Sequence, residues 1–184
     1  MDSDYPESTY AVLGLVDKLP DSSGYDLAAV AGRSFAYFWP ISQTLLYREL
    51  ERLADLGWVT ATRVEQLRAP GKWTYRTTAA GQRALVEWLA GPAPAKSSFR
   101  SGVLLRLFFA YRMRPDQARA LVADYRRALR SQCDELQAIA DKLDAMATPE
   151  ARAGRLAALH GLRTAEARLA WTDEAEALLG DGPP

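Results

Sequence analysis

The chain has 184 residues, 48% of them hydrophobic, which suffices for the core of one ordinary domain or of two small ones. Its 23 basic residues balance 23 acidic ones, so a uniformly basic protein is excluded but a basic face is not. The single cysteine, Cys133, excludes an intrachain disulfide and agrees with a reducing cytosol.

The sequence predicts neither a secretion signal nor a membrane span. Its first residues, MDSDYPES, are acidic and lack the basic start and apolar run of a signal peptide. The most apolar stretch, from Val103 to Tyr111, is too short to cross a bilayer and contains Arg106. We therefore expect a soluble, cytoplasmic protein without a membrane partner.

Two helices are expected before residue 35. The first covers residues 8 to 19, and Ser8 or Thr9 can cap it. Its expected buried side is Val12, Leu13, Leu15, Val16 and Leu19. The second covers about residues 24 to 32, and residues 35 to 40 form a rigid aromatic connector because a proline ends them.

A third helix is expected from about residue 42 to residue 56. Gly57 is the natural left-handed residue at its end. The apolar stripe of this helix is Leu46, Leu50, Leu53 and Leu56. Its start is polar, with Ser42, Gln43 and Thr44 in succession.

A hairpin and a fourth helix follow. Residues 58 to 64 alternate and are rich in β-branched and aromatic residues, which predicts a strand. Residues 65 to 72 contain a Pro-Gly turn signal, and residues 73 to 77 form the returning strand. The helix covers residues 78 to 90, with an inward side of Leu85, Val86 and Leu89. Helix, hairpin and helix in this order form a winged helix-turn-helix.

The second half reads as helical after a linker at residues 91 to 98. A helix over about residues 99 to 113 carries on one side Val103, Leu104, Leu107, Phe108 and Tyr111. Pro115 then opens a helix with a heptad seam: Ala118, Val122, Tyr125, Leu129, Gln132, Leu136, Ile139, Leu143 and Met146. A last helix over about residues 149 to 179 has an apolar side of Leu156, Leu159, Leu162 and Leu169.

The predicted fold class is mainly α. An N-terminal winged helix-turn-helix with a two-stranded β-wing spans residues 1–90, and an all-helical C-terminal dimerisation domain spans residues 99–184. A long helical pair needs a partner to bury both faces, and the simplest partner is a second copy of the chain. The expected dimerisation residues are Leu104, Phe108, Val122, Tyr125, Leu129, Leu136, Leu143, Leu156, Leu169 and Trp171.

The basic residues concentrate where a winged helix would meet DNA. Residues 33 to 83 hold eight basic and four acidic groups, whereas residues 1 to 32 hold one basic and six acidic groups. Ser42, Gln43 and Thr44 are the candidates for base contacts, because such side chains pair with base edges in the major groove. Capping of the third helix is the alternative role for them.

The remaining candidate contacts are expected mainly at phosphates, which position a protein on DNA without reading sequence, and Tyr47 can reach a phosphate or a base edge. They are Tyr47, Arg48 and Arg52 on the third helix, Arg63, Arg68, Lys72 and Trp73 on the wing, and Gly24 and Tyr25 at the start of the second helix. Each has a structural alternative. Tyr47 can rest against the second helix, Arg48 and Arg52 can pair with Glu49 or Asp55, the wing cations can face solvent, and the second helix can be capped or packed.

No catalytic or metal-binding constellation is visible, so we expect no enzyme, no cofactor and no metal. His160 is the single histidine and, with one cysteine, cannot form a zinc site of ordinary ligand spacing. Cys133 is expected as a small buried helix residue, with a redox sensor as the alternative. A set of aromatic residues is expected in the core, with a ligand pocket as the alternative: Phe99, Phe108, Phe109, Tyr111, Tyr125 and Trp171.

The motifs together resemble the PadR-type transcriptional regulators, in particular those with a helical C-terminal domain of the virulence-activator type. The matching segments are YAVLGLV (10–16), GYDL (24–27), FWPIS (38–42), LYRELERLADLGWV (46–59), YRTTAAG (75–81) and, more loosely, FRSGVLLRLFF (99–109) with Trp171. The resemblance implies a homodimeric winged-helix DNA binder, commonly a repressor released by a small molecule. The chain departs from it at Thr44, where many relatives carry glycine, and at Thr77, where many carry a large aliphatic residue.

The sequence therefore predicts a sequence-specific DNA-binding transcriptional regulator that acts as a homodimeric repressor. Its expected partners are double-stranded DNA with a pseudo-palindromic operator, a second copy of the chain, and a small hydrophobic or aromatic effector. Two-fold symmetry places the half-sites about 34 Å apart, or at a multiple of that spacing. The alternative is a dimeric winged-helix module that binds another protein and not DNA.

Overall fold

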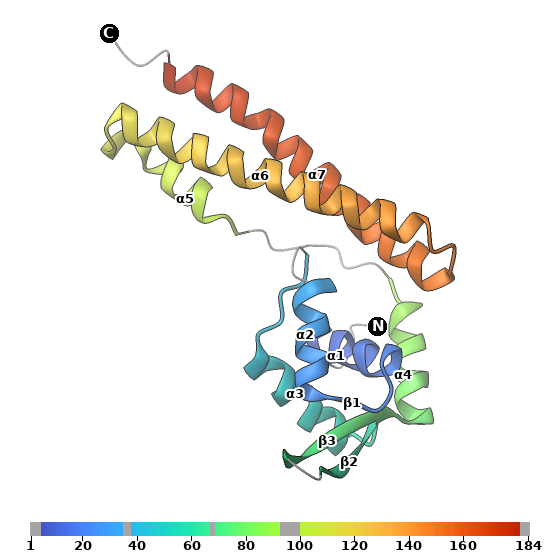
Figure 1. The fold of residues 1–184 in the computed structure, drawn as a ribbon. Helices are drawn as coiled ribbons and strands as arrows, with labels where there is room; N and C mark the ends of the chain where they lie inside the picture. Colours follow the sequence, from blue (N-terminus) through green and yellow to red (C-terminus); the bar gives the residue numbers. More distant parts are fainter. Residues whose placement is uncertain (1–4, 35–37, 67–68, 93–99, 181–184) are drawn as a thin grey trace. The chain divides into compact units, whose positions relative to one another are not determined.

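The structure is a computed structural model, and it describes residues 5–34, 38–66, 69–92 and 100–180. The chain forms two compact units, Met1–Ala95 and Lys96–Pro184, which are described separately below (Figure 1). Most of the predicted linker, and the predicted site residues Phe99 and Arg68, lie outside the described residues.

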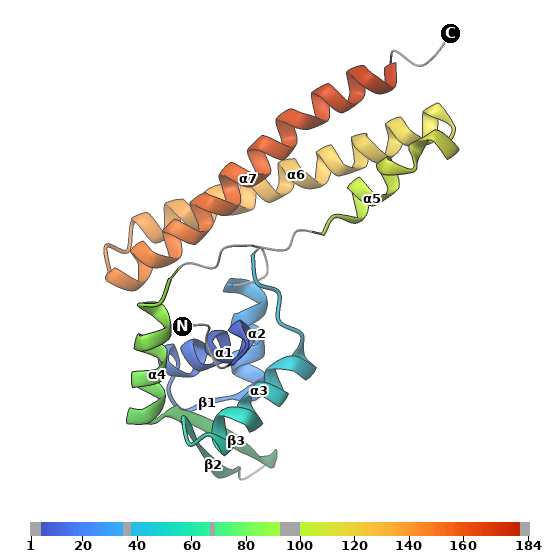
Figure 2. The ribbon, with the colours of Figure 1, turned by 180° about the vertical axis from the view of Figure 1, so that it is seen from behind.

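The first unit combines helices with a small antiparallel sheet. Its helices are α1 (Glu7–Lys18), α2 (Gly24–Ser34), α3 (Gln43–Asp55) and α4 (Ala79–Leu89). Its strands are β1 (Ser22–Ser23), β2 (Val59–Gln66) and β3 (Ala69–Thr77), and they lie in the order β1-β3-β2. Figure 2 shows the β2–β3 hairpin extending beyond the helices. This arrangement confirms the predicted winged helix-turn-helix, to which β1 adds a short strand that the sequence did not indicate.

Local signals fix where α3 and α4 begin and end. Ser42 is the N-cap of α3, and its Oγ accepts a hydrogen bond of 3.2 Å from the backbone N–H of Leu45. Gly57 has φ +67°, which confirms the predicted left-handed residue after α3. Thr78 caps α4 by accepting a 3.1 Å bond from the N–H of Gly81. The third helix therefore starts and stops as its sequence predicts.

The start of α1 differs from its prediction. The helix begins at Glu7, its N-cap is Pro6, and no side chain caps it. Ser8 and Thr9 lie inside the first turn, and their hydroxyls donate hydrogen bonds to the carboxylate of Glu49 on α3. The prediction that Ser8 or Thr9 caps α1 was wrong, because these hydroxyls serve a contact with α3.

The core of the first unit follows the apolar stripes of α1 and α3. Its fully buried members are Val12, Leu13, Leu15, Val16, Leu27, Ala31, Leu46, Leu50, Leu53 and Val59. Leu19 and Leu85 are partly buried against it. Since the stripes on α1 and α3 interlock, α3 has one face held in the core and the opposite face left to solvent.

Helix α4 presents a different face from the one predicted. Val86 and Leu89 are 64% and 66% exposed, so their inward assignment was wrong. The inward face instead contains Gly81, Leu85 and Trp88, spaced by four and three residues. A Cβ on Gly81 would lie 2.2 Å from the carbonyl oxygen of Trp58, and Trp88 stacks on Tyr10 with ring centroids 5.0 Å apart. This close approach of α4 to residue 58 sets the rotation of the helix.

The hairpin also differs in detail. Strand β2 continues to Gln66 and β3 begins at Ala69, and these two residues pair in register. The predicted turn over residues 65 to 72 was too long, because Pro70 and Gly71 belong to β3. The ladder is irregular between Val64 and Gln66, because one residue of β2, Glu65, lies opposite two residues of β3, Pro70 and Gly71.

The second unit consists of α5 (Gly102–Phe108), the 3-10 turn η1 (Ala110–Arg112), α6 (Pro115–Asp144) and α7 (Pro149–Gly180). Helices α6 and α7 lie side by side in both views (Figures 1 and 2). The buried residues of α6 fall on the predicted heptad seam: Ala118, Val122, Leu129 and Leu136, with Ala140 beside them. They face α7, whose buried residues are Ala151, Ala158, Leu162, Ala165, Thr172 and Ala175. The buried residues of the heptad seam of α6 therefore pack against α7 of the same chain.

Two sets of apolar residues in this unit are not buried as predicted. Helix α5 is shorter than residues 99 to 113, and its expected inward members Leu104, Phe108 and Tyr111 are exposed. Leu156, expected on the apolar side of α7, is also exposed, because alanines occupy the positions that face α6. Among the described residues, no helix is long and apolar enough to cross a membrane.

Candidate nucleic-acid interface

The polar start of α3 is open to solvent. Ser42, Gln43 and Thr44 are all exposed, and Ser42 also caps the helix, as the alternative reading of this segment expected. The side chains of Gln43 and Thr44 make no hydrogen bond to the described residues. Capping therefore accounts for Ser42 and leaves Gln43 and Thr44 available to base edges in a major groove.

A buried carboxylate lies on the opposite side of α3. Glu49 is fully buried, and its Oε2 accepts hydrogen bonds of 2.8 Å from Thr9 Oγ1 and from Arg52 Nη1. Its Oε1 accepts a 3.4 Å bond from Ser8 Oγ, and Arg48 Nη2 lies 3.7 Å away. Burying a carboxylate is costly unless it is paired and hydrogen-bonded, and these contacts satisfy both conditions. Glu49 therefore holds α3 to α1.

Sequence reasoning missed Glu49, although a signal existed. The residue lies three positions after Leu46 and four before Leu53, which places it within the apolar stripe of α3. Surrounded by Arg48, Glu51 and Arg52, it reads as one more charge on a solvated face. The helical position, and not the residue type, was the informative feature.

The two arginines of α3 differ in how closely they contact Glu49. Arg52 donates to Glu49 and, at 3.3 Å, to Thr9 Oγ1, and 36% of its side chain is exposed. Arg48 is 67% exposed and lies at the longer distance from the same carboxylate. The predicted contact of Arg52 with DNA thus competes with a structural role, whereas Arg48 extends into solvent.

Tyr47 packs on the start of α2. A Cβ added to Gly24 would lie 2.5 Å from Tyr47 Cε1, so only glycine leaves room for the ring in this position. Tyr47 remains 38% exposed, and Tyr25 is exposed as well. The ring therefore rests against α2, as one of the two readings of Tyr47 expected, and still presents part of its surface to solvent.

The N-terminus of α2 already holds a carboxylate. Asp26 Oδ2 accepts hydrogen bonds from the backbone N–H and the hydroxyl of Ser23, and the N–H of Asp26 donates to Ser23 Oγ at 3.2 Å. This is a reciprocal capping pair. The Ser23 hydrogen bonds, side chain first and then backbone, lower the pKa of Asp26 below its ordinary value, and Lys72 adds to this effect. The negative charge opposes the phosphate contact predicted at Gly24 and Tyr25.

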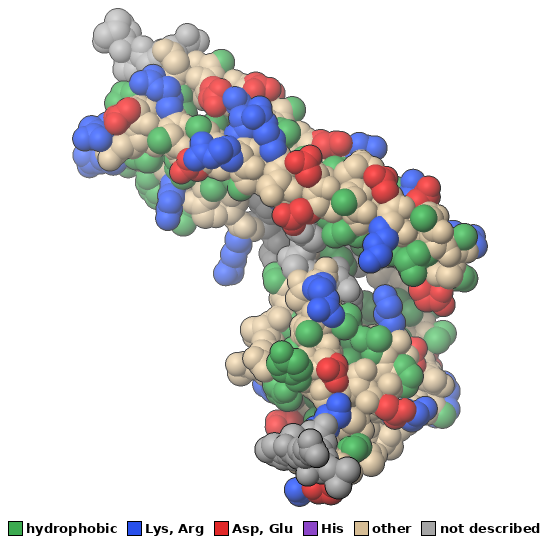
Figure 3. All heavy atoms as spheres, viewed as in Figure 1, with side chains coloured by type: hydrophobic (Ala, Val, Ile, Leu, Met, Phe, Trp, Pro, Cys, Tyr) green, Lys and Arg blue, Asp and Glu red, His purple; other side chains and the backbone are tan. Residues whose placement is uncertain are grey.

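Arg63 and Lys72, the two predicted wing cations among the described residues, lie on opposite faces of the hairpin. Arg63 pairs in register with Trp73, and Val64 pairs with Lys72, so alternation along the strands sends Arg63 and Lys72 to opposite faces. Arg63 Nε lies 2.9 Å from Glu65 Oε1, and Lys72 Nζ lies 3.8 Å from Asp26 Oδ2. Both cations and Trp73 are exposed. On the face shown in Figure 3, basic and acidic side chains are intermixed over both units.

The residues predicted to dimerise fall into three groups. Val122, Leu129 and Leu136 are buried against α7 of the same chain. Tyr125, Leu143, Leu169 and Trp171 are half-buried. Leu104, Phe108 and Leu156 are exposed. The first group is covered without a second chain, so the third group offers the apolar surface that a partner can reach.

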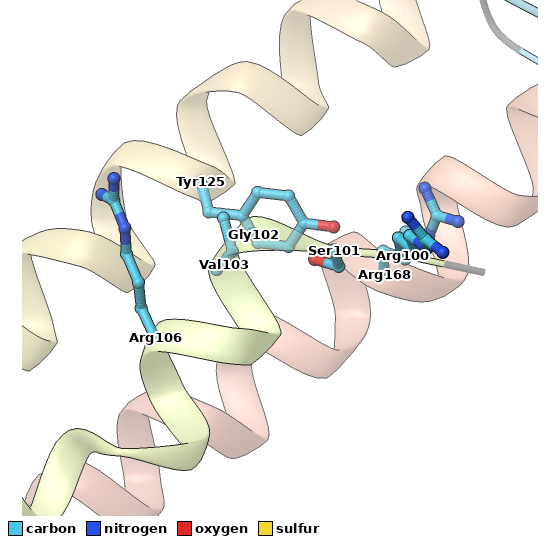
Figure 4. Close-up of a pocket in the computed structure, with 7 residues that line it drawn as sticks. All are labelled: Arg100, Ser101, Gly102, Val103, Arg106, Tyr125 and Arg168. Carbon is cyan, nitrogen blue, oxygen red and sulfur yellow. The ribbon is translucent and has the colours of Figure 1, made fainter.

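The aromatic set does not gather in one place. Phe108 and Phe109 contact each other edge to face, with centroids 5.1 Å apart, and both are exposed together with Tyr111. Their expected place in the core was therefore wrong. Tyr125 alone among these aromatics lines the pocket of Figure 4, in the second unit.

Cys133 and His160 both lie away from this pocket. Cys133 is half-buried; burial, followed by the charges of Glu166 and Asp134, raises the pKa of its thiol. A raised pKa lowers the thiolate fraction on which oxidation depends. His160 is exposed on α7.

Two family models match this chain. The model described as "Transcriptional regulator PadR-like family" matches residues 12–87, and the model described as "Virulence activator alpha C-term" matches residues 99–180. The two matches correspond to the first and the second unit of the structure. The "Negative transcriptional regulator PadR" of Bacillus subtilis (strain 168) is 29% identical over 140 residues, which are 76% of this chain and 76% of that relative.

Solved structures share the fold over nearly the whole chain. Bacillus subtilis PadR in complex with operator DNA has a TM-score of 0.81 at 24% identity, covering 95% of this chain and 99% of the other. The same protein with p-coumaric acid has a TM-score of 0.73 at 24% identity, covering 94% and 98%. The Vibrio cholerae virulence activator AphA has a TM-score of 0.70 at 26% identity, covering 96% and 99%. These matches confirm the predicted fold class.

Proposed function

Because this chain belongs to the PadR-like family of transcriptional regulators, we propose that it is a homodimeric, sequence-specific DNA-binding repressor. The observation that carries the proposal is the construction of α3. One side of the helix is fixed to α1 by the buried Glu49, and the other side presents Gln43, Thr44 and Arg48 to solvent. A rigid helix with an exposed polar start suits insertion into a major groove.

The exposed side chains fall into two groups, one suited to contacts with base edges and one suited to contacts with phosphates. Gln43 can pair with an adenine edge, and Thr44 can donate to or accept from several bases. Arg48, Arg63 and Lys72 are cations that suit phosphate contacts, which fix the register of the protein on the duplex. Because Arg52 already pairs with Glu49, we assign it a supporting role behind Arg48.

Dimerisation would use the second unit. Its exposed apolar residues, Leu104, Phe108 and Leu156, are the candidates for contact with the second copy. A two-fold dimer implies a pseudo-palindromic operator, with half-sites about 34 Å or a multiple apart. Repression is supported by the name of the Bacillus subtilis relative, a negative regulator, and an operator by its structure with operator DNA.

Two further features of the proposal come from the relatives. Bacillus subtilis PadR was solved with p-coumaric acid, so we propose that a small aromatic molecule releases this protein from its operator. Both relatives described above are named as regulators or activators, and we propose no catalytic activity. We propose that a regulator of this kind acts in the cytoplasm.

Salt-dependent binding to duplex DNA tests the proposal. The full chain should bind random duplex DNA at low salt, and the logarithm of its affinity should fall linearly with the logarithm of the salt concentration. Fluorescence anisotropy with a labelled duplex measures both. No binding at low salt would contradict the proposal and favour a dimeric module that binds another protein.

A further inference from the structure

The start of α2 contacts both elements that are proposed to bind DNA. On the side of α3, the ring of Tyr47 packs on Gly24. On the side of the hairpin, Lys72 Nζ lies 3.8 Å from Asp26 Oδ2, and strand β1, which directly precedes α2, pairs with β3. Asp26 is therefore an acidic residue placed between the helix and the wing that are expected to meet DNA.

The carboxylate of Asp26 is held in place by Ser23. Its Oδ2 accepts hydrogen bonds of 3.2 Å from the backbone N–H of Ser23 and of 2.6 Å from the Ser23 hydroxyl. Such bonds favour the charged form of a carboxyl group. Because Ser23 is 7% exposed and belongs to the sheet, the negative charge has a fixed position beside the wing.

The ion pair between Lys72 and Asp26 is open to a competing anion. The side chain of Lys72 is 43% exposed, and that of Asp26 is 51% exposed. Arg63 pairs with Glu65 of its own strand, whereas Lys72 pairs with a residue of a helix. A phosphate that approaches Lys72 therefore meets a carboxylate that attracts the same ammonium group and repels the phosphate.

We propose that Asp26 competes with DNA phosphates for Lys72 and thereby restrains the binding that does not depend on sequence. This inference rests on the proposed DNA-binding function. A phosphate contact carries no sequence information, so the competition lowers the affinity for every duplex and leaves the proposed base contacts of α3 unaffected. An exposed ion pair shifts an equilibrium about two- to fivefold, which sets the size of the expected effect.

Neutral variants of Asp26 test the competition. Binding of the full chain to a labelled random duplex is measured by fluorescence anisotropy at one low salt concentration. Asp26→Asn retains an oxygen that can accept from Ser23, and Asp26→Gln introduces a residue that capping boxes accept at this position. Both variants should bind about two- to fivefold more tightly than the wild type. Asp26→Glu keeps the charge and should bind no more tightly than the wild type.

A matched control separates the competition from a general effect of charge. Asp55→Asn removes the same charge from an exposed position at the end of α3, and its affinity should stay close to that of the wild type. Circular dichroism confirms that each variant is folded. The proposal is wrong if the neutral variants of Asp26 bind no more tightly than the wild type, or if Asp55→Asn binds as tightly as they do.

A double-mutant cycle shows whether Asp26 acts through Lys72. In a background of Lys72→Ala, Asp26→Asn should lose most of its gain in affinity, because no ammonium group is left for the carboxylate to hold. A merely structural role of Asp26 in capping α2 predicts no tightening in either background. A gain that is as large without Lys72 as with it would mean that Asp26 repels DNA directly, and it would overturn the competition.

The same titrations distinguish a failure of this proposal from a failure of the DNA-binding function. If the wild type binds random DNA and the neutral variants bind no more tightly, Asp26 exerts no restraint and the DNA-binding function stands. If neither the wild type nor any variant binds at low salt, the DNA-binding function fails and this inference fails with it.

Discussion

Thr9 Oγ1 on α1 donates a 2.8 Å hydrogen bond to Oε2 of Glu49 on α3, and Glu49 is fully buried. This bond joins two helices through residues that lie 40 positions apart in the sequence. Arg52 neutralises the same carboxylate from within α3. The helix proposed to read DNA is therefore fixed to α1 by the carboxylate of Glu49, which is buried from solvent.

Removing Glu49 should destabilise the first unit. Glu49→Ala leaves Arg52 without its carboxylate and Thr9 without its acceptor, and the loss of hydrogen bonds to a charged group costs about 1.5–3 kcal/mol. The free energy of unfolding, measured with urea, should fall by about that amount. Glu51→Ala removes an exposed glutamate of the same helix and should change it by less than about 0.5 kcal/mol. Similar values for the two variants would contradict the role given to Glu49.

The contact of Tyr47 with Gly24 predicts opposite effects for two glycines of α2. Gly24→Ala places a Cβ 2.5 Å from Tyr47 Cε1, so the ring must move, at a cost of about 1–3 kcal/mol. Nothing lies within 4 Å of a Cβ on Gly32, and Gly32→Ala should stabilise the helix by up to about 1 kcal/mol. Urea unfolding measures both.

A second substitution checks that Tyr47 is the cause. In a background of Tyr47→Ala, the cost of Gly24→Ala should largely disappear, which a double-mutant cycle detects. An unchanged cost would mean that α2 itself, and not the ring, rejects the alanine.

Thr77 offers a stabilising substitution. Its Oγ1 is buried and has no hydrogen-bond partner among the described residues. Thr77→Val replaces this hydroxyl by a methyl group of similar size and removes the cost of its burial, so the melting temperature should rise by the equivalent of about 1 kcal/mol. Thr60→Val is the control, because the exposed Thr60 hydroxyl donates to the carbonyl of Arg76. A melting temperature lowered by Thr77→Val would show that the hydroxyl is satisfied in solution.

The lowered pKa of Asp26 makes part of the stability depend on pH. A carboxyl whose pKa is lower in the folded state stabilises the fold above its unfolded pKa, near the ordinary value of 3.8. This contribution is lost as the pH falls through the folded pKa. The difference in unfolding free energy between the wild type and Asp26→Asn should therefore be larger at pH 7 than at about pH 3.

The control for this titration is Asp55→Asn, which changes an exposed aspartate at the end of α3. It removes one carboxylate outside the capping pair, and its unfolding free energy is measured at the same two pH values. If Asp26→Asn retains the full pH dependence, the capping pair with Ser23 does not form in solution.

Lys72 should act on DNA binding without regard to sequence. Lys72→Ala removes one proposed phosphate contact, so it should weaken binding to all duplexes alike and reduce the salt slope by roughly one. Lys142→Ala, which removes the same charge from an exposed position on α6, should leave the slope unchanged. A loss confined to one DNA sequence would contradict the phosphate role of Lys72.

The sequence predicted those elements whose signals are local. The leucine stripe of α3 and Gly57 at its end depend on neighbouring positions, and the structure confirms them, together with the Ser42 cap that was the alternative role for this residue. Strand β1 has two residues, too few to show a period, and it exists because Ser22 and Ser23 pair with β3. The inward face of α4 depends on how closely Gly81 approaches residue 58, which no periodicity encodes.

Tertiary partners account for the other differences. The heptad seam of α6 predicted a partner helix and could not say that α7 of the same chain supplies it. The role of Glu49 depends on Thr9, and the lining of the pocket in Figure 4 depends on Arg100, Arg106 and Arg168 meeting across three segments. Residue types alone indicated only a charged helix and arginines scattered along the chain. The contacts of Glu49 and of these arginines join residues that are distant in the sequence, so the sequence does not show them.

Selection of bound fragments from random duplex DNA tests whether α3 reads sequence and whether two copies of the chain bind together. The proposed homodimer predicts an enriched inverted repeat, with half-sites about one helical turn or a multiple apart. It also predicts that substituting Gln43 or Thr44 changes the enriched bases within each half-site, because these residues face the groove while Glu49 fixes the helix behind them. Enrichment of no sequence, or of the same sequence after both substitutions, would contradict the account.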